Sequence, residues 1–304
     1  MRKRVKIGID VGGTLIKMGL VDERAGIHFR REVKTPSNIS KIDLINYIIS
    51  NIEAIIYNAG VKKRDIAGIG MGVPGLVDSK RGIVHGMTNI RGWKDVPLKS
   101  ILEKRLRLKV EIDNDVNAMT LAEHKFGAGK GADNMVCVTL GTGVGGGIII
   151  SGCLYRGNAM SAGEIGHVPI NENGPKCNCG GTGCLESYIG NRRILIEARK
   201  AFNKNITLEA LSAAANKGDK KARAVWEAAA RRLAVALSGV INLLNPDRII
   251  IGGGVSKAGN LILGPLRKEI ACRAMDVPAR HVKIRLAELG SDAGIIGASL
   301  LILS

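Results

Sequence analysis

One histidine and three cysteines, grouped in a glycine-rich stretch, are the residues best suited to chemistry in this sequence. His167 lies upstream of Cys177, Cys179 and Cys184, so three of the six cysteines fall within eight positions. One imidazole and three thiolates form a complete tetrahedral set for zinc, and four protein ligands leave no open position for a substrate. The alternatives are chance clustering or a disulfide, which is strained between Cys177 and Cys179 because one residue separates them. The pattern favours a structural zinc site.

Two carboxylates flank this group of metal-binding residues. Glu164 precedes His167 by three residues, and Glu186 follows Cys184 by two. A glutamate is more often a solvated surface residue than a functional one. Here the two carboxylates are placed to line a polar pocket whose shape the metal maintains.

Three glycine clusters follow apolar strands and suit a nucleotide. Backbone N–H groups of such turns point at phosphate oxygens, and a threonine adds a hydroxyl donor. The first turn also carries Asp10, which is suited to hold Mg²⁺ through water. A plain hairpin is the alternative for this turn, because Gly-Gly is a good hairpin sequence. The clusters are Asp10-Val11-Gly12-Gly13-Thr14, the run 141–147 that begins Gly141-Thr142-Gly143, and Gly252-Gly253-Gly254, which opens a helix and suits contact with an adenosine.

The dipeptide Asn114-Asp115 lies where a strand passes into a helix. Both residue types cap helices well, so capping is the plainest interpretation of the pair. The functional interpretation is a general base at the end of the strand, and a cap and a base can coexist in one such dipeptide.

These motifs together resemble those of the ROK family (repressors, open reading frames, kinases), above all its bacterial-type glucokinases. The resemblance covers essentially the whole chain. The motifs that carry it are Cys177-x-Cys179-Gly180-x-x-Gly183-Cys184-x-Glu186, Asp10-x-Gly12-Gly13-Thr14, Leu140-Gly141-Thr142-Gly143-x-Gly145-Gly146-Gly147 and Gly163-Glu164-x-Gly166-His167.

The resemblance implies a fold, a reaction and a set of site residues. The implied fold is α/β and actin-like (hexokinase-like, ribonuclease H-like), with two domains around a cleft. The implied reaction is ATP- and Mg²⁺-dependent phosphorylation of a hexose, most of all glucose, with Asp115 as the base toward the 6-hydroxyl. The expected sugar contacts are Gly75, Asn89, Asn114, Asp115, Glu164, His167 and Glu186, with His167 also a zinc ligand. The expected nucleotide contacts are Asp10, Gly12, Gly13, Thr14, Lys17, Thr142, Gly143, Gly253 and Gly254.

Two alternatives stay open for the function. One is a kinase for another sugar: N-acetylmannosamine, N-acetylglucosamine, fructose or allose. The other is a sugar-responsive repressor, which the same family contains; only about six residues precede the first glycine-turn strand, too few for a DNA-reading module. Family members are commonly homodimers or homotetramers, so we expect one of these assemblies.

Composition narrows the class of protein. The 304 residues suggest about two domains, and the 45% hydrophobic content with only 3% aromatics predicts aliphatic cores. The net charge of +18 suits an anionic partner, but basic residues are scattered among acidic ones, so we expect a solvated surface and no specific nucleic acid. Neither a signal peptide nor a bilayer-spanning run is evident, which predicts a cytoplasmic protein without membrane contact. Cys137, Cys153 and Cys272 are expected to be buried thiols.

Apolar periodicity and glycine or proline breaks predict the order of the elements. An opening meander of strands (5–10, 15–21, 28–34) precedes a helix capped by Ser40, with Ile42 on its apolar face. Further helices are expected at 97–106, 118–126, 191–202, 208–216, 220–244 and 261–273, with a last one capped by Ser291 or Asp292. The repeat of a strand, a glycine turn and a strand at 7–14 and 136–143 predicts two similar halves. The expected domains are 1–118, with the helix at 291–304 packed on it, and 119–290 with the zinc loop.

Overall fold

The computed structural model describes residues 5–87, 92–203 and 205–302, which form two compact units. Unit 1 comprises the described parts of Met1–Gly127, Leu154–Ala162 and Ser291–Ser304. Unit 2 comprises those of Ala128–Cys153 and Gly163–Gly290. The expected boundary at residue 118 falls inside a helix that lies wholly in unit 1, and nothing in the sequence indicated that Leu154–Ala162 joins this unit.

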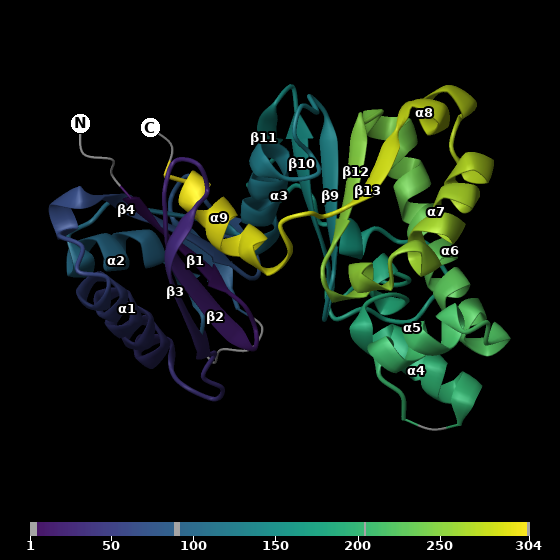
Figure 1. Ribbon diagram of the computed structural model, residues 1–304, viewed down its shortest axis with the longest axis horizontal. Helices are drawn as coiled ribbons and strands as arrows, with labels where there is room; N and C mark the ends of the chain where they lie inside the picture. The colour runs from purple at the N-terminus through teal and green to yellow at the C-terminus, as the bar shows by residue number, and fades with distance from the viewer. Residues whose placement is uncertain (1–4, 88–91, 204, 303–304) are drawn as a thin grey trace. The chain divides into compact units, whose positions relative to one another are not determined.

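The main sheet of unit 1 has five strands among the described residues, in the order β3-β2-β1-β4-β8 (Figure 1). The first three strands form an antiparallel meander, while β4 and β8 run parallel to β1. The strands are β1 (Val5–Val11), β2 (Leu15–Val21), β3 (Ile27–Lys34), β4 (Ile66–Val73) and β8 (Val110–Asn114). Since parallel neighbours end at the same edge, β4 and β8 deliver their last residues side by side.

Four of the described helices pack on the sheet of unit 1. Aliphatic side chains of β1 and β2 form a core with α1 and α2, while α9 contacts α3 and strands β1 and β4, and α3 also contacts β4. Ser40 caps α1 as expected, by accepting a hydrogen bond from Asp43 N at 3.2 Å. The helices are α1 (Lys41–Asn58), α2 (Leu98–Leu106), α3 (Asp115–Phe126) and α9 (Ala293–Leu300).

One expected detail of these helices is wrong and another is confirmed in part. Ile42 is 62% exposed, because it lies in the first turn of α1, ahead of the stripe that starts at Leu44 and Ile45. Asp292 occupies the N-cap position of α9, as expected, but its side chain makes no capping hydrogen bond and pairs with Arg30 of β3.

Glycines let α9 lie directly against the backbone of the sheet. A Cβ on Gly8 of β1 would lie 2.0 Å from the carbonyl oxygen of Ile295, and one on Gly70 of β4 would lie 1.7 Å from that of Ala298. Both distances are far inside van der Waals contact, and backbone atoms cannot rotate away as a side chain can. The glycine content of the strands is therefore a packing requirement of unit 1.

We expect Gly70→Ala to destabilise the protein by about 3 kcal/mol or more, at or beyond the upper end for overpacked cores. Urea denaturation followed by circular dichroism measures this change. The control is Gly239→Ala in helix α6 (Lys220–Leu244), where an added Cβ meets nothing within 4 Å. Alanine should be neutral or stabilising there. Equal stabilities for the two variants would refute the packing requirement.

The sheet of unit 2 repeats the strand order of unit 1. Its described strands run β11-β10-β9-β12-β13, with an antiparallel β9–β10 pair and with β12 and β13 parallel to β9. Counted along the chain within each five-stranded sheet, the strands thus occupy the same places in both sheets, as the internal repeat predicted. The strands are β9 (Met135–Leu140), β10 (Val144–Ile150), β11 (Cys153–Tyr155), β12 (Arg248–Gly252) and β13 (Lys283–Leu286).

Helices of unit 2 cover one face of its sheet. Trp226, Leu233 and Leu237 of α6 pack in one core with Val138 of β9 and Ile251 of β12. Thr207 caps α5 and Asp219 caps α6, and the expected bounds of α4, α5 and α6 are confirmed. The other helices are α4 (Asn191–Phe202), α5 (Leu208–Asn216), α7 (Asn260–Arg273) and α8 (Asp276–His281). Within the described chain, every helix is too short or too polar to cross a bilayer.

Short elements complete the units. A small sheet in unit 1 joins β5 (Val77–Asp78), β6 (Ile83–Gly86) and β7 (Lys94–Val96). Single 3₁₀ turns occur at η1 (Lys63–Asp65), η2 (Ile165–His167), η3 (Leu185–Ser187), η4 (Gly254–Ala258) and η5 (Gly290–Asp292). Cys137 is buried as expected, but Cys153 and Cys272 are exposed, since they lie at the start of an edge strand and on the outer side of α7.

Candidate active site and metal centre

The four expected zinc ligands come together in unit 2. The ligand atoms of His167, Cys177, Cys179 and Cys184 all lie within 4.8 Å of one another. The Cys179 and Cys184 Sγ atoms are 3.6 Å apart, and Cys177 Sγ lies 3.7 Å from His167 Nδ1. A disulfide would need about 2.05 Å between sulfurs, whereas tetrahedral bonds of about 2.3 Å to zinc give sulfur–sulfur edges of about 3.8 Å. The distances fit a shared metal ion and not a disulfide.

Tight turns bring these ligands to one point. His167 ends the η2 turn and Cys184 precedes the η3 turn, while Cys177 N donates to Gly181 O at 2.9 Å across the intervening loop. Gly183 has a φ of +70°, and a Cβ there would lie 1.7 Å from Asn171 O. Only glycine fits this left-handed, crowded position.

The electrostatics of the thiols favour a bound cation. Burial opposes ionisation of Cys177, but hydrogen bonds from the Cys179 backbone and from the Cys179, His167 and Ser187 side chains outweigh it and lower the Cys177 pKa to about 6. Burial, followed by the neighbouring thiols of Cys179 and Cys177, raises the pKa of Cys184 to about 12. A metal ion relieves this conflict, because it binds thiolates and displaces their protons.

Glu164 and Glu186 lie beside the metal-binding residues. Glu164 Oε2 is 4.0 Å from His167 Nε2, so His167 presents one ring nitrogen to the cysteines and the other to a carboxylate. Burial raises the pKa of Glu164; His167 opposes this shift and Glu186 adds to it. Glu186 Oε2 accepts a hydrogen bond from Val144 N at 2.9 Å, which ties the metal loop to the β9–β10 hairpin. The pocket-lining role of the two carboxylates stays a prediction.

The second and third glycine clusters meet at one end of the unit 2 sheet. Thr142 and Gly143 form the β9–β10 turn, in which Gly141 N donates to Gly143 O at 2.9 Å. Gly253 has a φ of +84°, and a Cβ there would lie 2.4 Å from Leu140 O, at the end of β9. Gly254 begins the η4 turn next to Gly253. These backbone segments are adjacent and free of bulky side chains, as a nucleotide cradle requires.

The first glycine cluster is a true hairpin between β1 and β2. Gly12 N donates to Leu15 O at 2.9 Å, and Thr35 Oγ1 donates to Gly12 O at 2.7 Å, while Gly13 and Thr14 stay exposed at the tip. Asp10 and Lys17 face each other across the strand pair. Burial raises the pKa of Asp10, and the charge of Lys17 opposes the shift. The hairpin geometry is compatible with phosphate binding, which stays a prediction.

The β8–α3 junction places Asn114 and Asp115 in different roles. Asn114 is the N-cap of α3, and its Oδ1 accepts from Val116 N at 2.8 Å and from Asn117 N at 3.2 Å. Its Nδ2 donates to Gly75 O at 3.1 Å, so the expected residues Asn114 and Gly75 do meet. Asp115 is the first helical residue and accepts a hydrogen bond from Val116 N at 2.9 Å. Asn89 lies outside the described residues.

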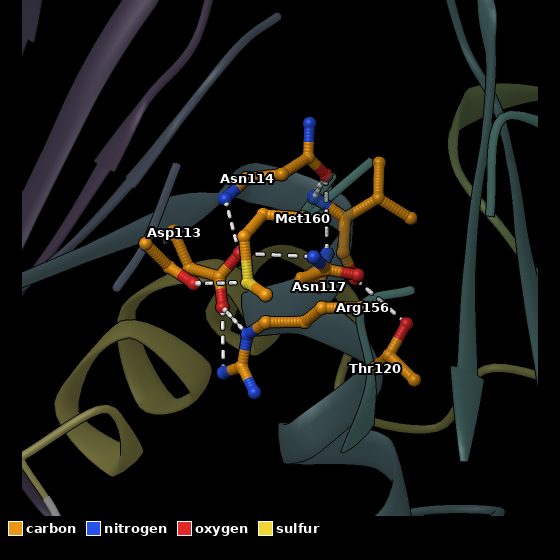
Figure 2. A network of polar contacts seen from close by, with 8 residues as sticks. Asp113, Asn114, Asn117, Thr120, Arg156 and Met160 are labelled. Atoms are coloured by element: carbon orange, nitrogen blue, oxygen red, sulfur yellow. Dashed lines mark hydrogen bonds and ion pairs between the residues drawn. The ribbon is translucent and has the colours of Figure 1, made fainter. Parts of the chain in front are cut away.

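Sequence reasoning missed two residues at this junction, Asp113 and Arg156. The Asp113 carboxylate is buried and forms an ion pair of 2.7 Å with Arg156 (Figure 2). The only local signal was an acidic residue directly after the last apolar position of β8. Nothing in the sequence connects it with an arginine 43 residues away.

The duplicated sheets and their glycine hairpins define an actin-like, hexokinase-like α/β fold, which confirms the expected class. Residues 6–304 match the model of the ROK family. The chain belongs to the ROK family.

Named relatives span nearly the whole chain. A glucokinase of Halalkalibacterium halodurans is 38% identical over 99% of this chain and 96% of its own length. A xylose repressor of Caldicellulosiruptor bescii is 31% identical over 98% of this chain and 78% of its own. The crystal structure of a ROK glucokinase from Streptomyces griseus with glucose and AMPPNP has a TM-score of 0.85 and 35% identity, with 98% of each chain covered.

Proposed function

We propose that this protein is an ATP-dependent kinase that phosphorylates glucose at the 6-hydroxyl. The observation that carries the proposal is the β8–α3 junction, where Asn114 caps the helix and Asp115 supplies a carboxylate in the first turn of α3, directly after edge strand β8. Support comes from the names of its relatives, among them the glucokinase that is similar over 99% of this chain.

In the proposed reaction, residues of both units contact the sugar and the nucleotide. Asp115 orients the 6-hydroxyl and accepts its proton, so that the hydroxyl oxygen attacks the γ-phosphorus, the bond from that phosphorus to the β–γ bridging oxygen breaks, and ADP leaves. Glu164, His167 and Glu186 hold the other sugar hydroxyls. The nucleotide is contacted by both units: by Gly12, Gly13, Thr14 and Lys17 of unit 1, and by Thr142, Gly143, Gly253 and Gly254 of unit 2. Mg²⁺ would neutralise phosphate charge beside Asp10.

The proposal includes a structural zinc ion held by His167, Cys177, Cys179 and Cys184. This donor set fits zinc because it is three sulfurs and one imidazole whose ligand atoms all lie within 4.8 Å of one another. Zinc would supply folding energy to a loop that has little apolar core of its own. Through His167 and the η3 turn, the loop keeps Glu164 and Glu186 in position. We also propose that the protein forms a homodimer or homotetramer, which light scattering measures.

A coupled ADP-release assay across a panel of hexoses tests the function. We expect glucose to give the highest kcat/KM, because Glu164, His167 and Glu186 suit a ring whose hydroxyls are all free. A clearly higher kcat/KM for N-acetylmannosamine would reject the glucose assignment and keep the kinase class. Absence of phosphorylation, together with tight operator-like DNA binding at physiological salt, would favour the repressor function that the xylose repressor relative suggests.

A further inference from the structure

Asp113 is a fully buried carboxylate that has no part in the proposed chemistry. It lies on β8, two residues before Asp115, and its side chain is 0% exposed. Burying an unpaired carboxylate is costly, so such a group needs a partner charge and hydrogen bonds to every lone pair that water would have satisfied. The groups that contact Asp113 therefore indicate which part of the structure this carboxylate holds in place.

Each oxygen of Asp113 has a separate set of partners (Figure 2). Oδ1 accepts from Asn114 N at 2.7 Å and from Asn117 Nδ2 at 2.9 Å. Oδ2 accepts from both Nε and Nη2 of Arg156, each at 2.7 Å. The amide oxygen of Asn117 has no partner among the described residues, so Asp113 is what orients this side chain. Oδ1 thus contacts the β8–α3 junction, and Oδ2 contacts Arg156.

Arg156 lies on a segment that we call the strap, residues Leu154–Ala162. The strap begins within β11 and clusters with unit 1, and the chain re-enters unit 2 at Gly163, next to Glu164. The strap is closed by a hydrogen bond of 3.0 Å from Ala162 N to Arg156 O. Ser79 Oγ of unit 1 contacts Met160 Sδ at 3.9 Å. The strap thus has a defined shape, and Arg156 supplies its charged contact with the junction.

We propose that Arg156 is a positioning residue for phosphoryl transfer. Its two nitrogens fix Asp113 in the orientation from which Oδ1 holds the Asn114 N–H, and Asn114 is the residue that caps α3 and contacts Gly75. The backbone that carries Asp115 is therefore set by a chain of contacts that starts on the strap. Arg156 acts on this backbone through the Asp113 carboxylate. The inference rests on Asp115 acting as the base.

Removing Arg156 is expected to affect the reaction rate, whereas removing an arginine that only stabilises the fold is not. Without Arg156, the buried Asp113 carboxylate stays charged but loses the two hydrogen bonds that Arg156 donates. Rotation of the carboxylate toward other donors relieves the free-energy cost of that loss. Any such rotation pulls on the Asn114 N–H and so moves Asp115. A displacement of about 1 Å in a reacting group can cost about 10²-fold in rate. Lysine keeps the charge but presents one nitrogen in place of a planar pair, so it restores only part of the orientation.

The test compares Arg156→Met, Arg156→Lys and Arg31→Met. Arg31 is a matched control: it is a half-buried arginine on β3, at the opposite edge of the same sheet, and donates to Asn51 Oδ1 at 2.7 Å. We expect kcat for glucose to fall about 10²-fold in Arg156→Met and about 10-fold in Arg156→Lys, with the KM for ATP within about threefold of the parent. Arg31→Met should lose stability without losing kcat.

We measure kcat at saturating substrate concentrations and well below the melting temperature of each variant. All variants are then folded, so a difference in kcat does not reflect unfolding. A kcat within about threefold of the parent in either folded Arg156 variant would overturn the proposal. If Arg156→Met does not fold, Arg156→Lys decides by the same criterion. A parent protein without kinase activity would instead refute the proposed function, so the two failures are distinguishable.

Discussion

Replacing Asp115 with Asn lowers kcat about 10²–10⁴-fold and leaves the fold intact. Asparagine keeps the size of the side chain and an Oδ1 that can accept from Val116 N, and the cap of α3 is Asn114, which is unchanged. What disappears is the carboxylate that we propose as the acceptor of the proton of the 6-hydroxyl. Loss of a general base costs roughly 3–5 kcal/mol of barrier, which corresponds to this range of rates.

The experiment is a coupled assay of kcat, combined with glucose binding by calorimetry. The Asp115→Asn variant should still bind glucose, because its amide retains a hydrogen-bonding group. The matched control is Asp43→Asn, the same chemical change in the first turn of α1 in the same unit. It should cost at most about 1 kcal/mol of stability, through the helix dipole and the cap, and leave kcat unchanged. If folded Asp115→Asn turned over glucose at a near-parent rate, Asp115 would be a structural residue only.

Replacing Cys179 with Ser should release the metal and weaken the whole loop. Serine removes one of four ligand sulfurs, and the remaining three positions bind zinc far less tightly; we expect at least about a 10²-fold loss of affinity. Structural zinc sites supply folding energy of about 10–16 kcal/mol in small peptides. The melting temperature should therefore drop by several degrees, and the KM for glucose should rise, since Glu164 and Glu186 lose their support.

Mass spectrometry and a chelator titration measure the loss of metal. Separate values of KM and kcat show whether sugar binding or the chemical step is affected. Cys272→Ser is the control: this thiol is exposed on α7, outside the metal-binding residues, and should change neither metal content nor KM. Active parent protein that contains no zinc would contradict the metal proposal outright. A fall in kcat equal to that of Asp115→Asn, with KM unchanged, would place the cysteines in the chemical step instead.

Much of the fold could be predicted because its signals are local. The bounds of α5 and α6 follow from the capping residues Thr207 and Asp219 and, for α6, from a proline after the last turn, while those of α4 follow from aliphatic periodicity. The two glycine hairpins follow from short motifs in strand–turn–strand sequences. The cluster of one histidine and three cysteines was also predictable, since the three cysteines lie within eight positions. In each case the residues that define the feature are neighbours in the chain.

Other features could not be predicted because their partners are distant or their elements are short. The strands of the β5-β6-β7 sheet contain two to four residues, too few for any periodicity to emerge. The Asp113–Arg156 ion pair joins residues 43 positions apart, and neither residue belongs to a recognisable motif. The contacts of Glu164 with His167 and of Glu186 with Val144 N depend on the turns around the candidate metal ligands, whose geometry no residue pattern specifies.

The packing of α9 against Gly8 and Gly70 has a consequence for synthesis on the ribosome. The sheet of unit 1 is translated early, but the helix that covers its glycine face comes from residues 293–300. At about 5–20 residues per second, translation from Gly127 to Ala293 takes roughly ten to thirty seconds. Throughout that interval the nascent sheet exposes a flat, side-chain-poor surface to solvent or to chaperones. Unit 2 is complete before unit 1 closes, so the first half of the chain to be made is the last to finish folding.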